Sequence, residues 1–369
     1  MPELGPGMTP LTTDLAPERE ASPVRPGVIP AARPRAPGLR AASARSRIDL
    51  RSSGMTVIGA LAHLALLLAP PALADEAFIT SQPAEALSIV DLTTRKVVAT
   101  LPISGKPAGI AVSVDGARAF VTSPDGKALT ILDAATRTVT HRVELGGGPL
   151  GVAVHPSGSP AYVADWYQHR IKVVDAASGT VSGEVAVGQS PSGLAVTPDG
   201  ALLLSADRDS DAVSLIDTAT LTRLASIPVG ARPFGVTIDA EGARAYTANV
   251  ASNDVSVIDL KARKVVATVT VGARPYAVAL ARGLAFVTDQ YDSTVTVFDT
   301  KTLEKRATIP VGDYPEGIAA SRDGAFVYVA CWEANTLDII DSATLKVVET
   351  IPVADGPRAF GAFIRRTGE

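Results

Sequence analysis

Short runs of alternating apolar and polar residues recur along the chain from about residue 77 to residue 364. Within residues 233–271 four such runs follow one another: GVTID, AYTAN, DVSVID and KVVATVTV. Alternation with β-branched residues predicts strands, and the Gly, Asp, Pro and Thr residues between the runs predict turns. No segment has sustained helical periodicity, so the pattern predicts an all-β protein.

The strand pattern occurs seven times. A hydrophobic–Asp pair recurs at spacings of 42, 42, 42, 42, 40 and 42 residues, at Asp91, Asp133, Asp175, Asp217, Asp259, Asp299 and Asp341. Prolines recur with the same spacings, at Pro107, Pro149, Pro191, Pro233, Pro275, Pro315 and Pro357. An aromatic or leucine residue precedes each Asp by 13 positions, at Phe78, Phe120, Tyr162, Leu204, Tyr246, Phe286 and Tyr328. Four strands in each of seven units predict a seven-bladed β-propeller with four-stranded antiparallel blades.

The two ends of the repeat array predict how the ring closes. The chain enters at a second strand, residues 77–81, and leaves after a first strand, residues 357–364. We therefore expect the C-terminal strand to complete the N-terminal blade, which leaves no free inner edge. One unit, from Pro275 to Phe286, is two residues shorter, which predicts a trimmed hairpin turn.

The first 74 residues have a different composition. Residues 1–54 hold nine prolines and eight arginines but no aromatic residue, so we interpret them as disordered or as an extension upstream of the true translation start, near Leu50 or Met55. Residues 55–74 contain an apolar run and end in Ala72-Leu73-Ala74, which predicts a signal peptide cleaved after Ala74. The alternative is an uncleaved membrane anchor, for which the run is short. Residues 75–369 would then be the mature propeller, periplasmic or secreted.

Composition narrows the functional classes. Residues 75–369 hold 26 basic and 33 acidic side chains, a balance of about −7, which disfavours a general binder of nucleic acids or anionic membranes. The single cysteine, Cys331, excludes an intramolecular disulfide framework. No phosphate-binding loop, dinucleotide fingerprint, serine elbow or His-Glu-x-x-His motif occurs, so we expect neither cofactor nor metal. We expect a monomer without a membrane span in the mature chain.

The repeat resembles the YVTN-repeat family of seven-bladed propellers, which includes the YncE-like secreted bacterial proteins. The residues that carry the resemblance are Pro-x-Gly, Tyr-Val-x-Asn/Asp, Val-x-Val-Ile-Asp and Val-Val-x-Thr-Ile-Pro-Val-Gly, nearly unbroken in residues 233–272 and 315–353. The resemblance covers residues 77–364. It implies the fold but not an activity, because most members of the family have none assigned.

Residues shared by all seven units are explained by geometry, so function is sought where the units differ. Two loops of each unit reach the same face, one before the inner strand and one after the second strand. They would gather both tryptophans with several tyrosines and arginines on a surface that we call the aromatic–arginine face: Trp166, Tyr167, His169, Arg208, Arg232, Phe234, Arg274, Tyr276, Tyr291, Tyr314, Glu316, Trp332 and Arg358. Arginine presents planar donors for carboxylates, and tryptophan and tyrosine present stacking surfaces.

This composition leaves several readings open. The face could bind a small anionic or aromatic ligand, a polymer or a periplasmic or cell-surface protein; alternatively, its side chains could pack on one another as a lid over the channel. An enzyme on the same scaffold, resembling lactonases or quinoprotein amine dehydrogenases, would use Glu316, Arg358 and His169. Binding of single-stranded DNA, which the YncE resemblance suggests, is opposed by the negative charge. No catalytic residue is assigned.

Three further residue types have a structural and a chemical reading. Cys331 is interpreted as a small thiol in a polar slot and not as a nucleophile or metal ligand, although an intermolecular disulfide stays open. His169 is the best histidine for a general base or axial ligand, but lone loop histidines are more often neither. Asp165, Asp207 and Asp289 share one column and could bind calcium, but a structural role is favoured.

Overall fold

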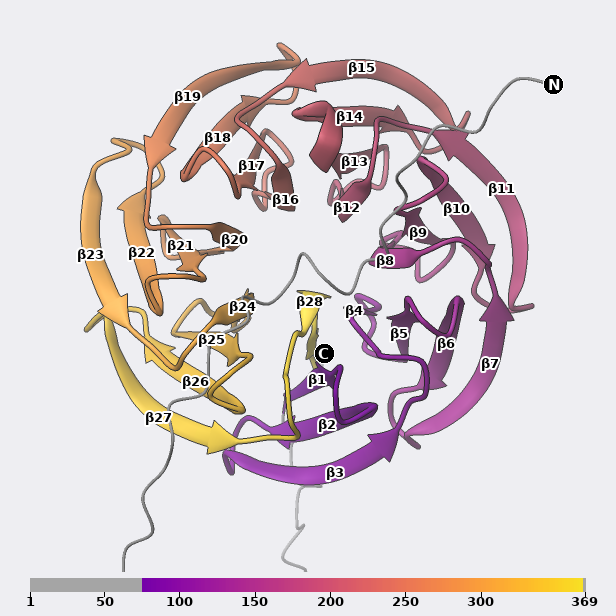
Figure 1. Ribbon diagram of the computed structural model, residues 1–369, viewed down its shortest axis with the longest axis horizontal. Coiled ribbons are helices and arrows are strands. Elements are labelled where there is room, and N and C mark those ends of the chain that lie inside the picture. The colour runs from indigo at the N-terminus through magenta and orange to yellow at the C-terminus, as the bar shows by residue number, and fades with distance from the viewer. Residues whose placement is uncertain (1–74, 368–369) are drawn as a thin grey trace, which may run out of the picture. The chain divides into compact units, whose positions relative to one another are not determined.

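The computed structural model describes residues 75–367, in which seven blades of four antiparallel strands each surround a central axis (Figure 1). This confirms the predicted seven-bladed propeller. Within this range the chain forms 29 strands and one short 3₁₀ helix. The predictions for residues 1–54 and 55–74 lie outside the described residues. No helix in residues 75–367 has the length and apolarity needed to cross a bilayer.

The blades follow the sequence order. The first contains β1 (Glu76–Ser81), β2 (Ala86–Asp91) and β3 (Lys96–Pro102). The second contains β4 (Gly109–Val112), β5 (Arg118–Ser123), β6 (Ala128–Asp133) and β7 (Thr138–Glu144). The third contains β8 (Pro149–Val154), β9 (Ala161–Asp165), β10 (Arg170–Asp175) and β11 (Thr180–Ala186). The fourth contains β12 (Pro191–Val196), β13 (Leu202–Asp207), the 3₁₀ helix η1 (Arg208–Ser210), β14 (Ala212–Asp217) and β15 (Thr222–Pro228).

The remaining blades repeat this arrangement. The fifth contains β16 (Pro233–Ile238), β17 (Arg244–Asn249), β18 (Asp254–Asp259) and β19 (Lys264–Thr270). The sixth contains β20 (Pro275–Ala281), β21 (Leu284–Asp289), β22 (Thr294–Asp299) and β23 (Lys305–Pro310). The seventh contains β24 (Pro315–Ala320), β25 (Phe326–Cys331), β26 (Thr336–Asp341) and β27 (Lys346–Pro352). The C-terminal segment adds β28 (Phe360–Ala362) and β29 (Ile364–Arg365).

The core lies between neighbouring blades. Because both faces of each sheet pack on another sheet, the second strands are almost wholly buried, whereas the outermost strands alternate between exposed and half-buried positions. Phe120 of the second blade packs with Val163 of the third, and Tyr246 of the fifth with Phe298 of the sixth. The recurring aromatic column is therefore a packing column.

The repeated aspartates end the third strand of each blade and close a turn. Asp133 Oδ1 accepts the backbone N–H groups of Ala135 at 3.0 Å and Thr136 at 2.7 Å, and equivalent bonds occur in the other six blades. Such bonds stabilise the carboxylate, hold the pKa of Asp133 below its usual range and lower that of Asp299 to about 2. The aspartate column is structural, as its repetition predicts.

The glycines after the prolines set the approach of the inner strands. A Cβ on Gly151 would lie 1.8 Å from the carbonyl oxygen of Ser192 on the next inner strand, and one on Gly235 would lie 2.6 Å from that of Tyr276. The same contact recurs around the ring, with separations of 2.1–2.5 Å at Gly109, Gly193, Gly317 and Gly361. Only the sixth blade has alanine, Ala277, at this position. The missing side chains let the strands converge at the axis.

The C-terminal segment closes the ring, as predicted, and also forms a strand pairing that the repeat does not predict. β29 pairs antiparallel with β1, and Pro357 forms a bridge with Ser81. Between these contacts, β28 turns away and pairs parallel with β4 of the second blade. The reason is length: Pro357 and Gly361 are four residues apart, whereas this separation is two in the other repeats that have the glycine. The two extra residues push the segment toward the axis.

Candidate functional site

The two predicted loops of each blade do meet on one face. In the third to seventh blades, a hydrogen bond of 2.9–3.2 Å from a backbone N–H of one loop to a backbone carbonyl of the other joins the two loops. The donor and acceptor residues are Trp166 and Gly148, Arg208 and Ser190, Val250 and Arg232, Gln290 and Arg274, and Trp332 and Tyr314. This continuation of the strand ladder places the residues before each inner strand beside those after each second strand. It therefore brings the predicted columns together as the aromatic–arginine face.

An aromatic cap covers the axis on this face. Phe234, Tyr276 and Phe360 have ring centroids 4.4–5.5 Å apart, and Trp166 lies 6.4 Å from Phe234. The three central rings are 2–5% exposed. At the axis, the predicted site residues therefore pack on one another as a lid. Sequence reasoning missed Phe360, although the two extra residues after Pro357 were a visible signal.

A buried polar network adjoins the cap through the Tyr276 hydroxyl. Arg358 Nε donates to Glu316 Oε2 at 2.7 Å, and its terminal nitrogens donate to the Tyr276 hydroxyl and to Gln82 Oε1. Glu316 and Arg358 are each 3% exposed. Burial opposes the charge on Arg358, but the Glu316 carboxylate outweighs it and raises the Arg358 pKa, so the guanidinium stays protonated. Burial also raises the pKa of the Tyr276 hydroxyl, which remains neutral.

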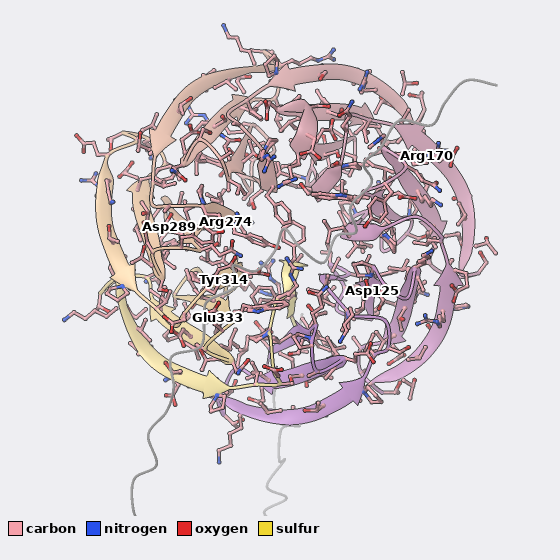
Figure 2. All side chains as sticks on the ribbon, in the orientation of Figure 1. Asp125, Arg170, Arg274, Asp289, Tyr314 and Glu333 are labelled. Carbon is pink, nitrogen blue, oxygen red and sulfur yellow. The ribbon has the colours of Figure 1, made fainter. Side chains whose placement is uncertain are left out.

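The network continues outward to an exposed cluster. Gln290 Nε2 donates to Glu316 Oε1 at 2.8 Å, while Gln290 Oε1 accepts from Arg274 Nε at 2.7 Å. The Arg274 guanidinium lies 4.9 Å from the centroid of the Tyr291 ring and also donates to its hydroxyl at 3.1 Å. Tyr291 is 53% exposed and lies 5.8 Å from the half-buried Tyr314 ring. Figure 2 shows Arg274 and Tyr314 on the same side of the axis.

Burial, the main cause, raises the pKa of Tyr314 to about 12, so its hydroxyl also stays neutral at physiological pH. The cluster of Arg274, Tyr291 and Tyr314 thus places one guanidinium beside two phenol rings. It is exposed to solvent on one side and fixed to the buried network on the other.

The remaining members of the face lie elsewhere on it. Trp166 is half-buried with the Arg208 guanidinium 5.3 Å from its ring, and Tyr167 is 50% exposed. Trp332 is half-buried with the Arg358 guanidinium 5.2 Å from its ring. Arg232 is exposed, and its guanidinium makes no hydrogen bond or ion pair with any residue between 75 and 367.

His169 occupies a repeated scaffold position. Its Nδ1 accepts the backbone N–H of Ser190 at 3.1 Å. In other repeats the side chain at the same position also accepts the backbone N–H of the residue before the repeated proline. These side chains are Glu85, Asp211, Asn253 and Asn335. Nδ1 of His169 is therefore occupied as a hydrogen-bond acceptor. Among residues 75–367, His169 makes no hydrogen bond with Glu316 or Arg358. The 42-residue spacing of this column was the signal that sequence reasoning overlooked.

The column at the end of the second strand is buried, one residue per blade. Asp165, Asp207 and Asp289 each accept the N–H of a glycine in the adjacent loop at 2.9–3.0 Å. Burial raises the pKa of Asp207 and brings that of Asp289 to about 6. Cys331 is fully buried, and burial raises the pKa of its thiol, which disfavours the thiolate. Across residues 75–367, no three His, Cys, Asp or Glu side chains gather into a group that could hold a metal ion.

Comparisons with known proteins agree with this architecture. A profile of the YNCE-like beta-propeller family matches residues 51–155 and 246–363. No curated protein matches the chain. Hydrazine synthase of Kuenenia stuttgartiensis is 23% identical, with a TM-score of 0.63 over 69% of this chain and 89% of that one.

Two other solved structures are similar. A functionally unknown protein from Desulfotomaculum acetoxidans DSM 771 is 15% identical, with a TM-score of 0.68 over 77% of this chain and 99% of that one. The dihydro-heme d1 dehydrogenase NirN, in complex with DHE, is 19% identical, with a TM-score of 0.58 over 78% of this chain and 75% of that one. At these identities the likeness shows the fold alone.

Proposed function

The chain belongs to the YNCE-like family of beta-propellers, and on that scaffold we propose that it is a binding protein whose aromatic–arginine face takes a small aromatic anion. The observation that carries this proposal is the exposed cluster of Arg274, Tyr291 and Tyr314, anchored through Gln290 on the buried Glu316–Arg358 pair. The three central rings belong to the lid, so we place the ligand at the rim of the face.

The chemistry of the cluster suits a planar anion. The guanidinium of Arg274 is held by Gln290 and Tyr291, so its orientation is fixed before a ligand arrives. Arg232, before the neighbouring inner strand, adds an exposed guanidinium for a carboxylate. The Tyr291 ring offers a stacking surface that is already half open to solvent.

Isothermal titration calorimetry with benzoate, 4-hydroxybenzoate, phthalate and ferulate tests this function. We expect at least one of them to bind saturably and the double variant Arg232→Ala/Arg274→Ala to lose that binding. Arg170→Ala is the control, because Arg170 pairs with Glu184 on an outer part of the third blade, away from the cluster (Figure 2). Equal binding by the wild type and the double variant would place the site elsewhere.

The enzyme alternative receives less support from the geometry. Glu316 and Arg358 are buried and bonded to each other, and His169 accepts a backbone N–H on another loop. The three residues that would serve as acid, base and oxyanion donor therefore do not line one accessible cleft.

Binding of single-stranded DNA is also less favoured. The loops that carry the arginines carry exposed acids as well: Asp209, Asp292, Asp313 and Glu333. Affinity for an oligonucleotide that fell steeply with rising salt would nevertheless establish this alternative.

Export to the periplasm or the medium is part of the proposal. The composition of residues 55–74 supports a signal peptide. Intact-mass measurement of the protein from its own host should then give the mass of residues 75–369. Recovery of any peptide from residues 1–45 would contradict the proposed translation start.

A further inference from the structure

A cavity of about 640 Å³ runs along the axis of the propeller. Its wall is formed by the inner strands and is dominated by small and aliphatic side chains, among them Val154, Val196, Ile238 and Leu280. The volume and the apolar wall are typical of small-molecule sites. Of the aromatic cap only Phe360 lines the cavity, and none of the residues predicted for the aromatic–arginine face does, so the two sites are distinct.

The aromatic cap lies at one end of the cavity, and turns between strands lie at the other. Phe360, part of the aromatic cap, lines the first end together with the glycines at the start of the inner strands. At the opposite end it reaches the turns between first and second strands, where Val114, Pro156, Pro198 and Ala240 line it. A ligand would therefore enter from the face opposite the aromatic–arginine face.

The polar side chains of the wall are largely satisfied by the protein itself. The Ser113 hydroxyl donates to Asp115 at 2.6 Å, and that of Thr237 donates to the carbonyl of Val278 at 2.7 Å. Asp239 lines the mouth, but its Oδ1 accepts the backbone N–H groups of Ala243 and Arg244. An apolar ligand would therefore leave few hydrogen-bonding groups of the wall unpaired.

Arg366 differs from these groups. It lines the cavity, is exposed, and its guanidinium makes no hydrogen bond or ion pair within residues 75–367. Its neighbour Arg365, by contrast, is bonded to Glu76 at 2.8 Å and to the Gly116 carbonyl at 2.9 Å. Only Arg366 is therefore available to an acid group at this cavity.

We propose that the axial cavity binds a slender amphipathic carboxylate, with its aliphatic chain along the apolar wall and its acid group at Arg366. An unbranched chain suits an axial space lined by seven inner strands. Burial of the chain provides most of the affinity, and the carboxylate–guanidinium pair fixes the orientation.

Fluorescence displacement or calorimetry with octanoate, decanoate and dodecanoate, below their micelle concentrations, tests this site. Affinity should rise by up to about fourfold for each added methylene group until the cavity is filled. 1-Decanol should bind more weakly than decanoate, and Arg366→Ala should weaken decanoate by about fivefold while leaving decanol unchanged, because the Arg366 pair is exposed to solvent.

A cavity-filling variant locates the binding. Ala362 lies on β28, lines the cavity and is exposed, so a larger side chain there has room without overpacking the core. Ala362→Phe should reduce decanoate affinity at least about tenfold, and Ala362→Leu by less. Val181→Phe, on the exposed outer strand β11, is the matched control and should bind like the wild type.

Three results would overturn the proposal: no saturable binding of any chain length, wild-type affinity in both Ala362 variants, or equal loss in the Val181 control. Circular dichroism and urea midpoints of all variants show that they are folded. Failure here leaves the proposed aromatic–arginine function untouched, because that function is tested with different ligands and with variants at Arg232 and Arg274.

Discussion

At the scale of single residues, the most consequential contact is the buried pair of Glu316 and Arg358. Both residues are 3% exposed. Besides each other, Arg358 bonds to Tyr276 and Gln82, and Glu316 bonds to Gln290. A buried charge that loses its partner is expensive, whereas an exposed ion pair contributes little. The pair therefore holds the aromatic–arginine face in place and does not serve as a set of reactive groups.

Glu316→Ala should lower the free energy of unfolding by about 3–5 kcal/mol, because it leaves the Arg358 cation buried and unpaired. The matched control is Glu144→Ala, which removes the exposed Arg142–Glu144 pair and should change stability by less than about 0.5 kcal/mol. Urea unfolding measures both. A similar small effect for the two variants would contradict the assigned role.

Asp289 predicts a pH dependence. Burial raises its pKa to about 6 in the folded state, above the ordinary value of 3.8. The folded state therefore holds the proton more tightly, so this group favours folding below about pH 4 and loses that contribution as the pH rises through 6. The loss corresponds to about 3 kcal/mol.

Asp289→Asn tests this dependence, since Asn249 occupies the same position of the fifth blade. The free energies of unfolding of the wild type and the variant are measured between pH 4 and 7. The wild type should lose about 3 kcal/mol of stability relative to the variant as the pH rises through this range. A constant difference across this range would show that the carboxyl does not titrate there.

At the scale of elements, the inner strands depend on glycine. The repeat columns predicted the strands, the Asx turns and this glycine ring, because each follows from local geometry that recurs seven times. They could not predict that β28 pairs with β4, because that pairing arises from the two extra residues in a single, unrepeated segment. Phe360 lies in this segment and was missed, although the two extra residues are visible in the sequence. His169 was considered as a general base, although the residues at its position in other repeats accept a backbone N–H for structural reasons.

Gly151→Ala should destabilise the protein by about 3 kcal/mol or more, because its Cβ would lie 1.8 Å from the backbone oxygen of Ser192. Ala277→Gly is the reverse change at the equivalent position of the sixth blade and should cost about 1 kcal/mol or less. Thermal or urea unfolding distinguishes the two. Equal effects would show that the close approach of the inner strands is not what requires glycine.

At the scale of the whole molecule, closure of the ring rests on the C-terminal segment. Phe363 is fully buried, its carbonyl accepts the N–H of Phe78, and β28 and β29 pair with two different blades. The segment and its partner blade could be predicted from the sequence, as could the position of the two loops of each blade on one face. The division of this face into the packed cap and the exposed cluster of Arg274, Tyr291 and Tyr314 could not, because it depends on side-chain burial.

Deletion of residues 357–369 should leave the inner edges of β1 and β4 unpaired. We expect the truncated chain to form oligomers or aggregates, since open strand edges pair with other chains. Size-exclusion chromatography with light scattering gives the mass in solution. A monomeric and fully folded truncated protein would contradict the closure role of the segment.

The central claim is that the rim of the aromatic–arginine face binds a small organic anion, and native mass spectrometry of protein isolated from its own host tests it most directly. We expect the wild type to carry a ligand-sized mass excess and Arg232→Ala/Arg274→Ala to have the mass of its bare chain. The same mass excess over the bare chain in both proteins, or no excess in either, would contradict the claim.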